Sequence, residues 1–313
     1  MSLSATHPPD RKPENPVAIL DAAPGRVGLR VRDLERARGF YVGTLGLTVA
    51  SEAGKTITLR AGAAAHSGRE LIVLTELPHL MPRPHRPVTT GLYHVALLLP
   101  ERRDLARTIA HLARSGYPLA GMADHSVSES LYLADPDGNG LEIYADRPRD
   151  RWIMRGGRPV VTTDPLDVDD LLATAGAPAP WAGLPSDTAI GHVHFTVSDL
   201  AAADRFYGAT LGLDKTIAIP ALTGYAAGGY HHHVNANVWA GAGAPPDDRA
   251  VAGLDWWELV VGDADAQDAI RTRAIAAGAR AERAGDALPL TDADGTRVVV
   301  RVRPAGPSAA RRP

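Results

Sequence analysis

The chain has 313 residues, 22% charged residues and a net charge of −3, which suits two domains and provides no strong field to attract nucleic acid or anionic membranes. No apolar run approaches the roughly 18 residues that would cross a bilayer. The chain has no cysteine, so disulfides, thiolate metal sites and cysteine nucleophiles are excluded, and any metal must be held by His, Asp, Glu or backbone oxygen.

The two ends of the chain carry no predicted elements. Segment 1–26 is polar and rich in proline, and it lacks the apolar stretch of a signal peptide. We therefore expect a cytoplasmic protein. Residues 1–24 and 305–313 are expected to be disordered tails.

An internal repeat organises the rest of the chain. Segment 31–47 returns as 197–213 with more than half of its positions identical. An alternating run typical of a strand precedes each copy, Asp33 and Asp199 stand at expected helix N-caps, and a glycine follows each expected helix. Each copy therefore predicts a strand, a helix and further strands.

Two further segments have the same layout with weaker identity, so the sequence predicts an α+β protein of four βαβββ units. The units are 25–83, 91–148, 190–243 and 252–304, with a connector at 149–188. One unit alone would expose an unpaired strand edge and half of an apolar face, so the units are expected to pair. Four units would give two concave mixed sheets with helices outside.

Polar side chains gather on the predicted concave faces. Period-two alternation places His94, Glu142 and His192 opposite the apolar residues of their strands. A strand at 230–238 would present His231 and His233 together with two asparagines. A single histidine at the start of a strand is more often a surface residue, but a buried carboxylate is costly without a partner. The recurrence of such residues at equivalent ends of repeated units favours a site.

The donor set predicts a metal site. Two histidines and one carboxylate are typical of non-haem Fe(II) sites that leave positions open for substrate and oxygen. Zn(II), Ni(II) and Mn(II) accept the same donors, so the donor types alone do not choose the metal.

The repeated unit, with its Phe-Tyr-x-x-x-Leu-Gly-Leu motif, resembles the vicinal oxygen chelate superfamily, which includes glyoxalase I, bleomycin-resistance proteins and extradiol dioxygenases. The resemblance covers about 25–304 and implies the four-unit fold. The stretch from His125 through Leu131-Tyr132 and Asp135-Pro136 to Glu142 is similar to the extradiol dioxygenase signature. Ala123 departs from it, where the pattern usually has Gly, Asn, Thr, Ile or Val.

The resemblance implies roles for individual residues. Glu142 would be an iron ligand, Tyr132 would hydrogen-bond a bound catechol, and His125 would be a hydrogen-bonding residue outside the ligand set. His94 would take the place of a first-strand ligand. The Gly229-Tyr-His-His-His-Val segment is similar to the one that supplies that family's acid–base histidine, and strand parity favours His233, with His232 as the alternative.

Extradiol enzymes of this type usually draw their ligands from the last two units, and here this chain departs. The last unit has Trp256 and Val299 in the two ligand positions, and the first has Arg26 and Ile72. Only the second and third units keep donors. We therefore expect these two units to share the active sheet, while the first and fourth form an inert one. In the usual pairing, Glu258 would be the next candidate carboxylate.

The predicted function is Fe(II)-dependent extradiol cleavage of a catechol-type aromatic diol by O2. One alternative is a glyoxalase-like isomerase or thiol transferase that uses Ni(II) or Zn(II). Another is a metal-free protein that binds an aromatic ligand or antibiotic. No nucleic-acid or membrane partner is expected, and a homo-oligomer is left open.

Overall fold

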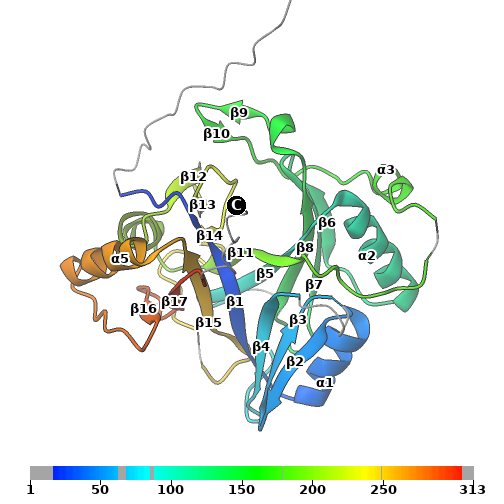
Figure 1. Ribbon diagram of the computed structural model, residues 1–313, viewed down its shortest axis with the longest axis horizontal. Helices are drawn as coiled ribbons and strands as arrows, with labels where there is room; N and C mark the ends of the chain where they lie inside the picture. The colour runs from blue at the N-terminus through cyan, green and yellow to red at the C-terminus, as the bar shows by residue number, and fades with distance from the viewer. Residues whose placement is uncertain (1–16, 63–67, 85–87, 178, 248, 305–313) are drawn as a thin grey trace, which may run out of the picture.

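The computed structural model describes residues 17–62, 68–84, 88–177, 179–247 and 249–304. Two large curled sheets form its centre, and helices cover their outer sides (Figure 1). The helical elements are α1 (Leu34–Arg38), η1 (Gly39–Thr44), α2 (Arg102–Ser115), η2 (Arg149–Arg151), α3 (Val168–Ala173), α4 (Leu200–Ala203), η3 (Asp204–Thr210) and α5 (Ala264–Ala276). None of the helices in these ranges is both long and apolar enough to cross a membrane.

The strands account for most of the ordered secondary structure. They are β1 (Ala22–Val31), β2 (Thr48–Ala53), β3 (Thr56–Arg60), β4 (Glu70–Glu76), β5 (Gly91–Leu99), β6 (Gly121–Asp124), β7 (Ser128–Ala134), β8 (Gly140–Asp146), β9 (Met154–Arg155), β10 (Arg158–Pro159), β11 (Ala189–Thr196), β12 (Asp214–Ile219), β13 (Leu222–Ala226), β14 (Val234–Asn237), β15 (Gly253–Val261), β16 (Ala287–Thr291) and β17 (Arg297–Val302).

The eight-stranded sheet, called here the site sheet, has the order β12-β13-β14-β11-β5-β8-β7-β6. The seven-stranded sheet, called here the second sheet, has the order β16-β17-β15-β1-β4-β3-β2. Each sheet joins strands from distant parts of the chain along a central antiparallel pair, β5 with β11 and β1 with β15. The α+β class with two concave mixed sheets is confirmed. The strand order also confirms the expected pairing of the second predicted unit with the third, because β5 lies beside β11.

The repeated segments begin their helices in the same way. The carboxylate of Asp33 accepts a hydrogen bond from the backbone N–H of Arg36, and that of Asp199 accepts from Ala201 and Ala202. Both are N-caps, which satisfy amide groups that the first helical turn leaves unpaired. Each short α-helix then continues as a π-helical segment, η1 or η3.

A continuous apolar core lies between the sheets and under the helices. Alternate residues of the central strands enter it, among them Val193 and Phe195 of β11 and Trp257 of β15. The rings of Phe195 and Trp257 lie 6.2 Å apart between centroids and join the two sheets. Since side chains alternate along a strand, the other face of β11 carries His192 and turns toward the concave side.

The predicted N-terminal tail is wrong for residues 17–24. Ile19 is buried, and its N–H donates to the carbonyl of Gly212 at 2.8 Å. Strand β1 begins at Ala22, which pairs with Val261 of β15. The local sequence does not reveal this pairing, because β15 lies far away along the chain. Residues 1–16 and 305–313, the rest of the predicted tails, lie outside the described residues.

Candidate active site

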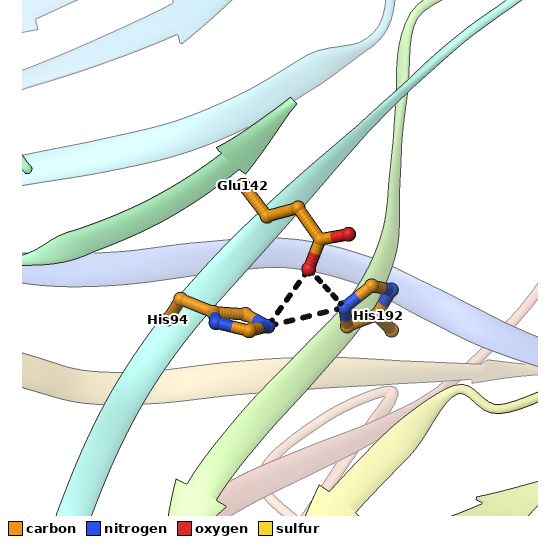
Figure 2. Close-up of side chains that lie close together, drawn as sticks. All are labelled: His94, Glu142 and His192. Atoms are coloured by element: carbon orange, nitrogen blue, oxygen red, sulfur yellow. Dashed lines mark hydrogen bonds and ion pairs between the residues drawn. The ribbon is translucent and has the colours of Figure 1, made fainter. Parts of the chain in front are cut away.

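Three side chains from neighbouring strands of the site sheet converge on one point (Figure 2). His94 comes from β5, Glu142 from β8 and His192 from β11. The Nε2 atoms of the two histidines lie 3.2 Å apart, and each lies 3.0 Å from Oε2 of Glu142. Strand register explains this convergence, because Ala96 of β5 lies directly between Glu142 and His192.

Burial and mutual contacts together set the charges of Glu142 and His192. Each of the three residues is at most 6% exposed. Burial lowers the pKa of His192 to about 4, so its ring is neutral at pH 7, the form that binds metals. Burial alone would raise the pKa of the Glu142 carboxyl, but its contacts with His192 and His94 outweigh this and hold the pKa well below its usual range. The cluster therefore offers an anionic carboxylate from Glu142 and a neutral imidazole from His192, and the His94 ring lies beside them.

The donor separations fit a metal ion. Ligands about 2.1 Å from a metal and 90° apart would be about 3.0 Å from each other, which is close to the observed 3.0–3.2 Å. Within the described residues, these three form the group whose ligand atoms lie close enough together to hold a metal. The other carboxylate oxygen, Oε1, accepts a hydrogen bond from Ser130 at 2.6 Å, which orients Glu142.

Packing holds the His192 ring. Its Nδ1 makes no hydrogen bond within the described part of the chain. The ring lies between Tyr144 and His232, with centroids 5.1 and 4.3 Å away. Gly191 makes this arrangement possible, since a Cβ atom there would lie 1.8 Å from the Tyr144 hydroxyl. The geometry of His192 therefore depends on close packing behind it.

Tyr132 and His125 form a hydrogen-bonded pair at the cavity wall. His125 Nε2 lies 2.6 Å from the Tyr132 hydroxyl, and Nδ1 lies 2.6 Å from the carbonyl of Thr162. Because a carbonyl only accepts, Nδ1 carries the proton, and a neutral ring accepts from Tyr132 through Nε2. Burial and the nearby Glu142 carboxylate raise the pKa of the Tyr132 hydroxyl. The hydroxyl therefore stays protonated at neutral pH.

The parity argument for His233 is wrong. Strand β14 begins only at Val234, because Gly228 and Gly229 adopt φ values of 60° and 68° and form a turn before the histidines. The ring of His233 stacks on Tyr230 at 4.8 Å, and its Nδ1 accepts from the N–H of Ala227. His232 lines the cavity instead. The alternation that predicted His233 does not extend back through an irregular turn.

The cavity in front of the cluster has a volume of about 560 Å³. Its walls include two features that the sequence reasoning missed. One is His194, whose Nε2 accepts a hydrogen bond from Asn237 at 2.9 Å; its position two residues after His192 on the same strand was the available signal. The other is the segment Val161–Thr163 of the predicted connector, which carried no signal in the sequence.

The equivalent positions of the second sheet hold no comparable donor set among the described residues. Trp256 is half-buried, and its indole lies against Gly28. Glu258 is buried, but its carboxylate accepts hydrogen bonds from Arg26 and Arg301 at 2.8–3.1 Å. Both carboxylate oxygens of Glu258 therefore accept hydrogen bonds from guanidinium groups.

Comparison with known proteins agrees with this architecture. Residues 23–143 match the model of the Glyoxalase/Bleomycin resistance protein/Dioxygenase superfamily. Over 271 residues the chain is 40% identical to the catechol-2,3-dioxygenase of Bacillus subtilis, covering 86% of this chain and 93% of that protein. The chain belongs to this superfamily. A 60-residue stretch is also 38% identical to biphenyl-2,3-diol 1,2-dioxygenase 3 of Rhodococcus globerulus, covering 19% of this chain and 32% of that protein.

Two solved structures have the same fold as this chain. A Bacillus subtilis structure matches 92% of this chain and 87% of its own with a TM-score of 0.60 at 13% identity. Glyoxalase I of Zea mays matches 90% of this chain and 92% of its own with a TM-score of 0.55 at 16% identity. At these identities the likeness concerns the fold alone.

Proposed function

We propose that this superfamily member is an Fe(II)-dependent extradiol dioxygenase that cleaves a catechol-type aromatic diol with O2. The observation that carries the proposal is the convergence of His94, Glu142 and His192 at 3.0–3.2 Å on the wall of a large cavity. Two imidazoles and one carboxylate suit Fe(II) and leave coordination positions open. The 40% identity to a catechol-2,3-dioxygenase over most of the chain supports the same reaction.

His94, Glu142 and His192 would hold the metal. When bound, the ferrous ion would bring the diol oxygens and O2 together and lower the pKa of the diol hydroxyls. The remaining residues of the cavity would bind the diol and move its protons. His232 lines the cavity next to His192 and would accept a diol proton as a general base and return it later.

Tyr132 would bind a diol oxygen. Its own proton is directed at His125, so its oxygen can accept a hydrogen bond from a substrate hydroxyl. Tyr132→Phe is expected to lower kcat/KM by about 10-fold, the value of one good hydrogen bond, without loss of metal. Tyr117→Phe is the matched control, because Tyr117 donates to the carbonyl of Ala134 and does not line the cavity. Equal effects of both substitutions would contradict this role.

The cavity suits a substrate larger than one unsubstituted ring. An apolar cavity of about 150 Å³ already holds benzene, whereas this cavity measures about 560 Å³. Leu133, Ile217, Leu222 and Trp239 contribute apolar surface to it. A diol with apolar ring substituents would fill this space and exclude water from the reacting groups.

Aerobic turnover of a catechol tests the proposal. The protein is loaded with Fe(II) without oxygen and then mixed with catechol or a substituted catechol and O2. We expect one O2 consumed for each ring opened, together with a yellow muconic semialdehyde-type product. Glu142→Ala treated identically is the control. A glyoxalase-like enzyme would be favoured by two results together. No diol is cleaved, and the Ni(II) or Zn(II) form converts an α-keto aldehyde and a thiol without oxygen. Absence of metal binding would favour a binding protein.

The second sheet gives a further test. Trp256→Ala is expected to leave the metal content unchanged, because an indole has no lone pair for a metal. The substitution should lower the free energy of unfolding by less than the roughly 3–5 kcal/mol of a fully buried tryptophan, since Trp256 is half-buried. Metal analysis and denaturant unfolding measure the two effects. Loss of metal would instead support a metal site built from the last two units.

A further inference from the structure

A chain of three polar side chains leads to the cavity from behind His232. Asp146 stands at the end of β8, and its Oδ1 lies 3.0 Å from Nε2 of His231. Nδ1 of His231 lies 2.8 Å from Nδ1 of His232. The three groups therefore run in the order Asp146, His231, His232, and only the last of them lines the cavity.

The hydrogen-bonding rules assign the protons along this chain. A carboxylate only accepts, so the proton between Asp146 and His231 belongs to His231 Nε2. A neutral imidazole carries one N–H, and Nδ1 of His231 is then an acceptor. When His231 is neutral, the proton between the two rings therefore belongs to Nδ1 of His232. This leaves Nε2 of His232 without a proton.

Close packing holds the His231 ring in this orientation. Its side chain is fully buried, and its ring lies against Tyr230 and Trp152, with centroids 3.9 and 5.4 Å away. A flip of the ring would replace both hydrogen-bonding nitrogens by carbon atoms, which would leave Asp146 and His232 unpaired. His231 is therefore held with one nitrogen toward each neighbour.

We propose that Asp146 and His231 are positioning residues that hold His232 in its Nδ1–H tautomer, so that Nε2 presents a lone pair to the substrate. The catalytic part of this inference rests on the proposed function. In serine proteases an aspartate sets the tautomer of the catalytic histidine directly, and its replacement by asparagine lowers kcat by about 10⁴ through the wrong tautomer. Here the aspartate, Asp146, would set the tautomer of His232 through one additional imidazole, that of His231.

The substitution Asp146→Asn tests whether Asp146 controls the His232 tautomer, and it changes the shape of the side chain very little. The Asn amide donates to Nε2 of His231, which moves the His231 proton to Nδ1 and the His232 proton to Nε2. In the metal-free full chain labelled with ¹⁵N-histidine, long-range ¹H–¹⁵N spectra report each tautomer, and His232→Ala identifies the His232 signals. We expect the Nδ1–H form in the unmodified protein, the Nε2–H form in Asp146→Asn and recovery of the Nδ1–H form in Asp146→Glu.

Turnover provides the second readout. In the Fe(II)-loaded protein, Asp146→Asn should lower kcat by about 10²–10⁴, the range of a general base, while iron content and KM stay unchanged. Asp150→Asn is the matched control, because it makes the same chemical change at an exposed residue, and it should alter neither readout. Circular dichroism checks that both variants are folded.

The tautomer measurement tests the positioning of His232, and the turnover measurement tests its catalytic role. An Nε2–H or doubly protonated His232 in the unmodified protein would overturn the tautomer assignment. So would an unchanged His232 tautomer in Asp146→Asn. Unchanged kcat in an Asp146→Asn protein whose tautomer has switched would overturn the catalytic role. If the tautomers agree but no diol is cleaved, the positioning of His232 is supported and the proposed function fails.

Discussion

Glu142→Ala should abolish metal retention while the protein remains folded. The carboxylate is the anionic member of the cluster, and its Oε2 lies 3.0 Å from both histidine nitrogens. Loss of a hydrogen bond to a ligand already costs about 10–100-fold in affinity, so loss of the ligand itself should lower metal affinity by more than about 100-fold. Metal analysis after dialysis, with thermal unfolding as the check on folding, measures the result.

Glu258→Gln is the matched control for this experiment. Glu258 is also a buried carboxylate on a central strand, but its partners are Arg26 and Arg301. Its replacement should leave the metal content unchanged and lower the free energy of unfolding by about 1–3 kcal/mol, the usual effect of weakening charged hydrogen bonds. Near-stoichiometric metal in Glu142→Ala together with loss in Glu258→Gln would contradict the assigned ligand set.

His232→Ala should retain the metal and lose turnover. His232 is in contact with His192 but is not a member of the converging donor set. Removal of a positioned acid–base group should lower kcat by about 10²–10⁴. Steady-state kinetics with the Fe(II)-loaded protein, together with iron analysis, separates this result from a failure of metal binding.

His233→Gln tests the neighbouring residue. The ring of His233 lies on Tyr230, away from the cavity, and glutamine can still accept the hydrogen bond from the Ala227 N–H. We expect kcat within the range of the unmodified protein and a small loss of stability. Normal turnover in His232→Ala with loss in His233→Gln would instead support the residue that strand parity favoured.

The repeat made most of the fold predictable. The N-caps Asp33 and Asp199 and the alternation of the central strands are local features, and such features decide which residues of a strand can face the core. The same alternation identified His94, Glu142 and His192, because each lies on a strand whose opposite face is apolar.

Other parts of the site depended on contacts that local sequence does not encode. Alternation holds only while the backbone remains a regular strand. The turn at Gly228 and Gly229 breaks it just before the three histidines, and His232 faces the cavity in place of His233. Likewise, His125 owes its tautomer to the carbonyl of Thr162, which lies 37 residues further along the chain.

By itself, the sequence of this protein determined its α+β architecture with two mixed sheets, the concave faces of β5, β8 and β11, and the candidate donor set. These follow from the periodicity of side chains and from the cost of burying a carboxylate without partners. Only the tertiary structure decided that the donors converge at metal-binding distances, which histidine enters the cavity, and that Asp146 stands behind it. Those outcomes depend on strand register and on turns between distant segments, where a shift of one residue reverses the direction of a side chain.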